Sequence, residues 1–178
     1  DLLILLKNKE KKRKMTDKKN LAENEKIEKL YTLYTFAYDK FNKFSNKKDN
    51  NMQLIKEMNA SLKSNSQIFT NPSQIWKYSL LLVEPFEKCS TKIMEVILSS
   101  MEEILKNNLV AADILQKMVE KLITHIHNYF KFNDMDFKVD SKILKICEMI
   151  YLNLNIFIHN ENLKSIIKIY LRIFLSSH

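Results

Sequence analysis

The sequence predicts an all-α protein arranged as a HEAT/armadillo-like stack of antiparallel helix hairpins. From residue 75 onward, apolar residues recur at three- and four-residue steps, and no segment has the alternation of a strand. Two consecutive pairs of predicted helices also match each other at a spacing near 50 residues, which is close to the HEAT and armadillo period. With 178 residues and 46% hydrophobic content, the chain is large enough for one core. An ordinary antiparallel bundle is the alternative arrangement.

Residues 1–20 are expected to be a basic, disordered tail that precedes a single helical domain over residues 21–178. The net charge of the chain is +8, and residues 7–19 hold eight Lys or Arg against two acidic residues, so the remaining residues carry a net +2. That is too little for a basic groove along the folded part, and no nucleic-acid partner is expected. A nuclear-localisation-like or membrane-surface role of the basic run is an open alternative.

Residues 1–6 (DLLILL) are far short of the about 20 apolar residues that span a bilayer, so we expect no transmembrane or secretory segment. The chain begins with Asp instead of Met, and we expect it to be a piece of a longer protein. Any membrane association is therefore expected to be peripheral, and part of the function is expected to lie outside these residues.

Residues 21–44 form the first predicted helix, which is amphipathic. Residues 45–74 are predicted to be an irregular loop, because SNKKDNN interrupts the periodicity and the Asn71-Pro72 step disfavours a helix. Only a short helix near residues 52–62 is expected within it. The apolar stripe of the first helix consists of Ile27, Leu30, Tyr31, Tyr34, Tyr38 and Phe41.

The regular helical repeat portion is predicted over residues 75–177. Its first helix, over 75–89, should end or bend near Val83 and Glu84, because Pro85 cannot continue it. Side chains that accept hydrogen bonds precede most of the later helices and are expected to cap them. These predicted elements are 91–107 after Ser90, 111–130, a loop over 131–140, a helix from Asp140 or Ser141 to about 155, and 161–176 after Asn160.

The internal match supports the repeat prediction. TKIMEVI at 91–97 corresponds in residue type to SKILKIC at 141–147, and the helices that follow align at a spacing near 48. Their apolar positions then pair as Leu115 with Leu163, Met118 with Ile166, Val119 with Ile167, Leu122 with Tyr170, and Ile126 with Phe174.

No catalytic, cofactor-binding or metal site is predicted, and the chain is expected not to be an enzyme. It has no glycine, so it lacks the phosphate-cradling loops of nucleotide-binding enzymes. His125 and His127 are two positions apart, which points them about 200° from each other on a helix and prevents both from binding one metal ion. The acidic stretch NDMDFKVD (133–140) lacks the central glycine of a calcium loop. Cys89 and Cys147 are expected to be buried and reduced.

Residues 77–115 and 140–177 resemble the N-terminal dimerisation and cyclophilin-binding (DCB) domain of the large, brefeldin-related Arf guanine-nucleotide exchange factors, or of their adaptor-like relatives without a catalytic domain. In that family a helix opens on a basic residue followed by Ile or Val, as at Lys92 and Ile93. Asn108 stands where the family favours glycine, and asparagine is the next-best residue for a left-handed turn. The apolar positions are Ile93, Ile97, Leu98, Met101, Ile104 and Leu105, and the closing motif is Ile158, His159, Glu161, Tyr170, Phe174, Ser176 and Ser177.

The resemblance implies a regulatory role. Domains of this kind precede a Sec-seven catalytic domain and a neighbouring helical domain, support dimerisation or packing on that neighbour, and engage an Arf-like small GTPase at Golgi membranes. A cytoplasmic, peripheral Golgi protein of vesicle-mediated transport is therefore expected. An unrelated HEAT/armadillo-type adaptor is one alternative, and a nucleic-acid-associated helical protein that uses residues 7–19 is another.

The last predicted helix is the candidate interaction site. Its apolar residues cover more than one face, and one neighbouring hairpin cannot cover them all. We expect the flanks to contact a further layer, either the next domain of a longer protein or a second copy of this one. The central face consists of Leu163, Ile166, Ile167, Tyr170 and Phe174, and the predicted interaction residues are Ile169 and Ile173 on one flank and Leu171 and Leu175 on the other.

Overall fold

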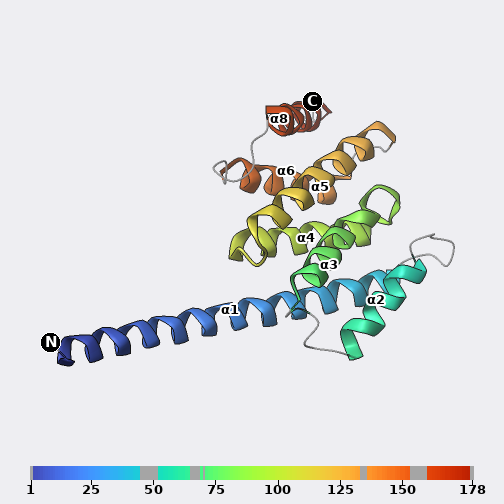
Figure 1. Cartoon of the computed structure of the whole chain (residues 1–178). Coiled ribbons are helices and arrows are strands. Elements are labelled where there is room, and N and C mark those ends of the chain that lie inside the picture. The colour runs from blue at the N-terminus through green and yellow to red at the C-terminus, as the bar shows by residue number, and fades with distance from the viewer. Residues whose placement is uncertain are drawn as a thin grey trace.

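The computed structural model describes most of the chain, namely residues 2–44, 52–64, 69, 71–132, 136–152 and 160–176. Every regular element within these residues is a helix, which confirms the all-α prediction (Figure 1). The elements are α1 (Leu2–Phe44), α2 (Met52–Ser64), α3 (Pro72–Val83), the 3-10 helix η2 (Glu84–Lys88), α4 (Thr91–Asn107), α5 (Ala112–Phe132), α6 (Phe137–Leu152) and α8 (Asn160–Ser176).

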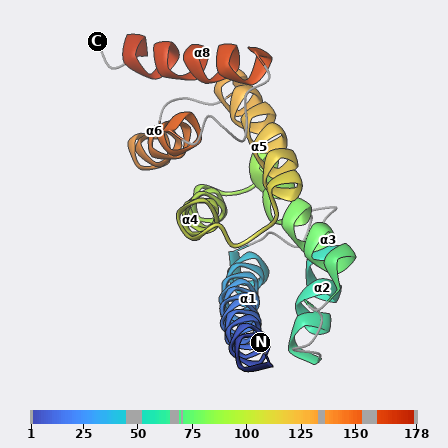
Figure 2. The ribbon, with the colours of Figure 1, turned by 60° about the vertical axis from the view of Figure 1, so that its left-hand side comes forward.

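The helices form two layers. In one layer α4 packs between α1 and α6, and in the other α5 packs between α3 and α8, while α2 lies beside α1. Figure 2 shows α1, α4 and α6 one above another, with α2, α3 and α5 beside them. One continuous hydrophobic core runs between the layers from α1 to α8, and these two helices lie at opposite ends of the molecule.

α1 is a single helix of 43 residues, which differs from the expected boundary between a disordered tail (1–20) and the helical domain. The chain has no glycine and its first proline is Pro72, so no helix-breaking residue interrupts α1. Residues 2–20 are also rich in Leu and Lys, which have favourable helix propensities. The N-terminal half of α1 extends beyond the other helices (Figure 1). The C-terminal half contains Leu30, Tyr34, Ala37, Tyr38 and Phe41, which are buried.

An aromatic cluster holds α1 to its neighbours. Tyr34 and Tyr38 of α1 contact each other and Tyr78 of α3, and Phe69 contacts Tyr34 and Tyr78. These ring pairs are mostly edge to face, with centroids 5.3–6.4 Å apart. Because a buried tyrosine hydroxyl needs a hydrogen-bond partner, the hydroxyls restrict the packing further. The Tyr38 hydroxyl donates to the Tyr78 carbonyl at 2.9 Å, and the Tyr78 hydroxyl donates to the Met58 carbonyl at 3.3 Å. The cluster therefore joins α1, α2 and α3.

The Tyr34 hydroxyl belongs to a buried chain of hydrogen bonds. It lies 2.6 Å from Ser79 Oγ, and Ser79 Oγ donates to the Ile75 carbonyl at 2.7 Å. Since the serine hydroxyl has one proton and the second bond uses it, Tyr34 is the donor of the first bond. Burial raises the pKa of Tyr34 well above its usual value, so the phenol stays protonated.

Both prolines lie at helix boundaries. Pro72 is the first residue of α3, where the missing N–H costs no helical hydrogen bond, and the Asn71 side chain accepts from the Ser73 N–H at 2.9 Å. The predicted loop up to residue 74 is therefore too long. The predicted break near Val83 and Glu84 is confirmed, because α3 ends at Val83 and η2 contains Pro85.

Asn108 forms a left-handed turn after α4, with φ 48° and ψ 50°. Its N–H donates to the Ile104 carbonyl, which satisfies one of the acceptors at the helix end. Asparagine tolerates this conformation better than other residues with a Cβ atom. The turn reverses the chain so that α5 can join the second layer.

α6 begins earlier than the sequence predicts. Asp136 Oδ1 accepts from the Lys138 N–H at 3.0 Å and from the Val139 N–H at 3.4 Å, so Asp136 caps the helix. The predicted caps, Asp140 and Ser141, lie inside the helix. The prediction was wrong here because Asp136 and Asp140 are both suitable N-cap residues by sequence.

Asp140 is a buried carboxyl group in the first turn of α6. Neither of its oxygens has a hydrogen-bond partner among the described residues. Burial, and to a lesser extent the charge of Asp136, raises the pKa of Asp140 to about 6. Because the folded state holds this proton more tightly than the unfolded state does, it loses stability as the pH rises from about 4 to about 6.

Ser79→Ala and Tyr34→Phe should have coupled effects on stability. Ser79→Ala leaves the buried Tyr34 hydroxyl without an acceptor and should lower the free energy of unfolding by about 1–3 kcal/mol, whereas Tyr34→Phe should lower it by about 1 kcal/mol. The double variant should lose less than the sum of the two single losses. Urea unfolding of the four proteins measures the coupling, and strictly additive losses would contradict it.

Asp140→Asn should weaken the dependence of stability on pH. Between pH 4 and pH 6 the free energy of unfolding of the wild-type chain should fall by about 1–3 kcal/mol more than that of the variant, which has no carboxyl proton to lose. Urea unfolding at several pH values measures this difference. Asp113→Asn is the matched control, because Asp113 is an exposed aspartate in the first turn of α5. The prediction fails if Asp140→Asn and wild type show parallel pH curves.

Candidate protein-interaction site

The structure turns a different face of α8 toward the core than the sequence predicts. Ile166, Ile169 and Ile173 are buried, on a helix that packs against α5 and α6. Ile169 and Ile173 are 1% and 6% exposed, so these two predicted interaction residues belong to the core of this chain. Their spacing of three and four residues places all three isoleucines on one stripe of the helix.

The other predicted flank is exposed, with Leu171 at 53% and Leu175 at 72%. Ile167, Tyr170 and Phe174, which the sequence predicts on the central buried face, are also exposed. At the helical rotation per residue, these five side chains cover an arc of roughly 140°. We call them the α8 face: Ile167, Tyr170, Leu171, Phe174 and Leu175.

Two contacts help to hold α8 in this orientation. The Arg172 guanidinium lies over the ring of Phe130 in α5, with 5.6 Å between Cζ and the ring centroid. The Tyr170 hydroxyl donates to the Leu144 carbonyl of α6 at 3.3 Å. The buried stripe and these contacts fix the rotation of α8, and Tyr170 forms the edge of the α8 face that lies next to α6.

Because of the orientation of α8, the internal sequence match does not extend to the burial of equivalent residues in α5 and α8. Equivalent positions of α4 and α6 are buried in both helices, as Ile97 and Cys147 show. In the following helices, Leu122 of α5 is buried but its equivalent in α8, Tyr170, is exposed. The reason lies in the packing, because α5 lies between α3 and α8, whereas α8 is the last helix of its layer in the described chain.

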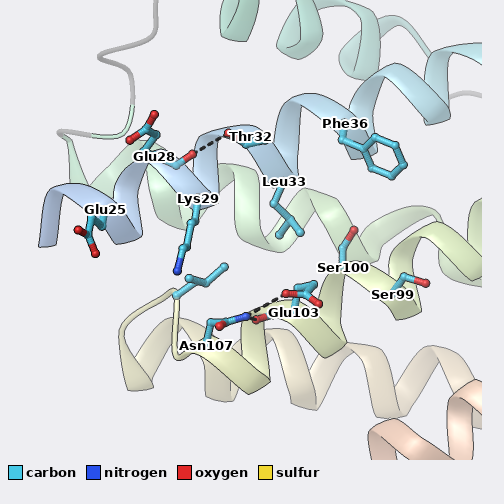
Figure 3. Close-up of a pocket in the computed structure, with 11 residues that line it drawn as sticks. Glu25, Glu28, Lys29, Thr32, Leu33, Phe36, Ser99, Ser100, Glu103 and Asn107 are labelled. Atoms are coloured by element: carbon cyan, nitrogen blue, oxygen red, sulfur yellow. Dashed lines mark hydrogen bonds between the residues drawn. The ribbon is translucent and has the colours of Figure 1, made fainter. Parts of the chain in front are cut away.

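A second surface feature is a groove of about 820 Å³ between α1 and α4 (Figure 3). Residues 25–36 of α1 line it at three- and four-residue steps, and residues 99–107 of α4 form the opposite side. Glu25 lies toward the Asn107 end of the groove, and Phe36 lies toward the Ser99 end. The two helices therefore run in opposite directions along the groove.

The end of the groove near Asn107 is acidic. Glu25, Glu28 and Glu103 line it, and Lys29 is the one cation among the lining residues whose side chains the structure describes. None of the three carboxylates forms an ion pair within the described part of the chain. Glu103 accepts from Asn107 Nδ2 at 2.9 Å, and the last carbonyls of α4 add partial negative charge. This end therefore has excess negative charge.

The opposite end is apolar, with cations beside it. Phe36 lines the groove there, with its side chain 55% exposed, and Leu33 lies nearer the middle of the groove (Figure 3). The Lys40 ammonium lies 5.2 Å from the centroid of the Phe36 ring, and the Lys142 ammonium donates to Ser99 Oγ at 2.9 Å. The groove thus changes along its length from anionic to apolar, and it ends beside two cations.

This groove was not predicted from the sequence. The polar positions of α1 have the ordinary pattern of a solvated helix face, and the pairing of α1 with α4 cannot be read from either helix alone. A weak signal was present in the helical spacing of Glu25, Glu28, Thr32 and Phe36, which places an aromatic residue on the same stripe as two acids.

The other residues considered for chemistry are placed as follows. His125 and His127 lie on α5, whereas His159, His178 and Asp134 lie outside the described residues. The described residues contain no cluster of three or more His, Cys, Asp or Glu side chains suited to a metal ion. Neither cysteine forms a disulfide bond. Cys147 is buried, which raises the pKa of its thiol to about 12, and Cys89 is half-buried.

Neither a membrane-spanning helix in the described part of the chain nor a similar known protein was found. Among the described residues, no helix combines the length and the apolar character needed to cross a bilayer. No protein-family model matches the chain, and no curated protein or solved structure matches it either.

Proposed function

We propose that the chain is a non-catalytic protein-interaction module of the HEAT/armadillo-like kind, and that the α8 face is its contact surface. The observation that carries this proposal is the exposure of five neighbouring apolar side chains on the last helix of a layer. Contiguous exposed apolar surface is typical of contact sites in soluble proteins. A terminal repeat that faces water normally has a polar outer side, so this apolar one favours a further layer.

The order of the helices supports the repeat character of the module. α1, α4 and α6 follow one another in one layer, and α3, α5 and α8 follow one another in the other. Each helix after the first pair therefore adds to the preceding one in its layer, as in a solenoid. Such a stack grows at its open end, which here is α8.

The resemblance of residues 75–177 to the DCB domain suggests the biological setting. Under this proposal the module belongs to a large Arf guanine-nucleotide exchange factor that acts in vesicle trafficking as a peripheral protein of Golgi membranes. It dimerises or packs on a neighbouring helical domain, and an Arf-like small GTPase recruits it. The exchange reaction belongs to a separate catalytic domain.

The chemistry of the α8 face indicates what covers it. Its aromatic and aliphatic side chains suit the apolar stripe of another helix pair, and Lys168 lies one helical turn before Leu171 at the edge of the face. A partner surface with an apolar centre and an acidic rim is complementary to it. When the isolated chain is in solution, the α8 face of a second copy of the chain supplies this apolar centre.

The double substitution Leu171→Lys and Leu175→Lys should prevent self-association without unfolding the chain. Both side chains are more than half exposed, so the added charges cost little in the isolated chain, but they would be desolvated in a contact. In sedimentation velocity experiments over a range of concentrations, the wild-type chain should associate and the double variant should remain monomeric. Thermal unfolding followed by circular dichroism checks that the variant is folded.

Phe137→Lys is the matched control for this experiment. Phe137 is also a large exposed apolar residue, but it lies at the start of α6, outside the α8 face. This variant should associate as the wild type does. A wild-type chain that is monomeric at every concentration, or a double variant that associates equally well, would contradict the proposed role of α8.

A further inference from the structure

We propose that the groove between α1 and α4 binds a helix of a partner protein. The side chains of this helix that face the groove are large and apolar at one end of the helix and are Lys or Arg at the other end. This site is distinct from the α8 face, because α1 and α8 lie at opposite ends of the molecule (Figures 1 and 2). It gives the module a second contact surface, with a different partner chemistry.

The shape of the groove suits a helix. Residues 25–36 of α1 line it over a length of about 16 Å, which corresponds to about three helical turns. Residues 99–107 of α4 form an opposite ridge about 12 Å long (Figure 3). A third helix laid between two such ridges presents side chains at three- and four-residue steps to both of them, as in helix-in-groove recognition.

The acidic end determines the charge of the occupant. Glu25, Glu28 and Glu103 line the groove, and none of them has an ion pair with a described residue. Lysine or arginine side chains of a bound helix would supply partners for these carboxylates, and because all three glutamates are exposed, salt should screen the resulting ion pairs. Lys29 lies among these acids, so the cations of the occupant should lie to either side of it.

The other end determines where the apolar side chains of the occupant lie. The exposed ring of Phe36 offers apolar contact area there, and Leu33 adds to it nearer the middle of the groove. Lys40 and Lys142 lie beside this end and would repel a second group of cations. The apolar end of the bound helix therefore lies beside Phe36, and its cationic end lies beside Glu103. The charge asymmetry fixes the direction of the helix in the groove.

The same charges disfavour other occupants. A nucleic acid or an anionic lipid surface would bring phosphates next to three carboxylates and to the negative end of the α4 dipole. The net charge of +8 does not change this, because residues 7–19 account for most of it. Within the groove the local charge is negative, and a polycation with an apolar segment is complementary to it.

A labelled synthetic peptide tests the proposal with the whole chain. The peptide is helical, with leucines at three- and four-residue steps in one half and lysines at such steps in the other. Fluorescence anisotropy should show saturable binding that weakens as the salt concentration rises, because salt screens the ion pairs. Glu25→Lys with Glu28→Lys should weaken binding at least about tenfold, through repulsion in place of attraction. Phe36→Ser should weaken binding at high salt as well as at low salt.

Matched variants separate the groove from general charge effects. Glu57→Lys with Glu148→Lys makes the same change in net charge at two exposed positions on α2 and α6, and this variant should bind like the wild type. Leu171→Lys with Leu175→Lys should also bind normally, which distinguishes this site from the α8 face. A control peptide with glutamates in place of lysines should not bind.

Three results would overturn the proposal. One is the absence of saturable binding, because the peptide has the apolar and cationic side chains that the proposed occupant requires. Another is equal weakening by the groove variants and the charge-matched control, which would indicate nonspecific attraction. The third is loss of binding in the α8 double variant, which would assign the peptide to the α8 face. Circular dichroism of each variant checks that the substitutions at these exposed positions leave the chain folded.

Discussion

The packing of three buried tyrosines sets the position of α1, and much of the remaining structure depends on it. A phenylalanine cluster would tolerate small shifts of one helix past another, but each buried hydroxyl must meet an acceptor. Tyr34 meets Ser79, Tyr38 meets the Tyr78 carbonyl, and Tyr78 meets the Met58 carbonyl. One arrangement of α1, α2 and α3 satisfies all three bonds. That arrangement also places the outer face of α1 beside α4, and the groove is the crease between these two helices.

The two candidate surfaces lie at opposite ends of one stack and differ in their chemistry. The α8 face is exposed because, among the described residues, α8 packs on one side only, against α5 and α6. The groove is acidic because two helices bring Glu25, Glu28 and Glu103 together on a chain whose overall charge is positive. A total charge is therefore a poor guide to a local site, since the basic run and the acidic groove occupy different parts of the molecule. A module with two such ends is suited to joining one helical partner to another.

The sequence predicted the existence of the helices well and several of their boundaries less well. Pro85 and Asn108 have strong local effects, and the break after Val83 and the left-handed turn after α4 lie where those residues stand. The start of α6 was misplaced, because both Asp136 and Asp140 are suitable caps and only the structure distinguishes them. Asp140 is instead a buried carboxyl without a hydrogen bond from a described residue. Local patterns do not report burial of a polar group, because the groups that surround it come from elsewhere in the chain.

The sequence by itself determined that this chain is helical and that its last helix has more apolar surface than one neighbour can cover. Only the tertiary structure decided which part of that surface is buried. A helix that is apolar over more than half of its circumference has no unique inner face, and its rotation is set by the shapes of α5 and α6 and by contacts such as that of Arg172 with Phe130. The groove needed the tertiary structure for a related reason. Its two sides are about 70 residues apart in sequence. Their charged side chains line one groove only because packing places α1 against α4.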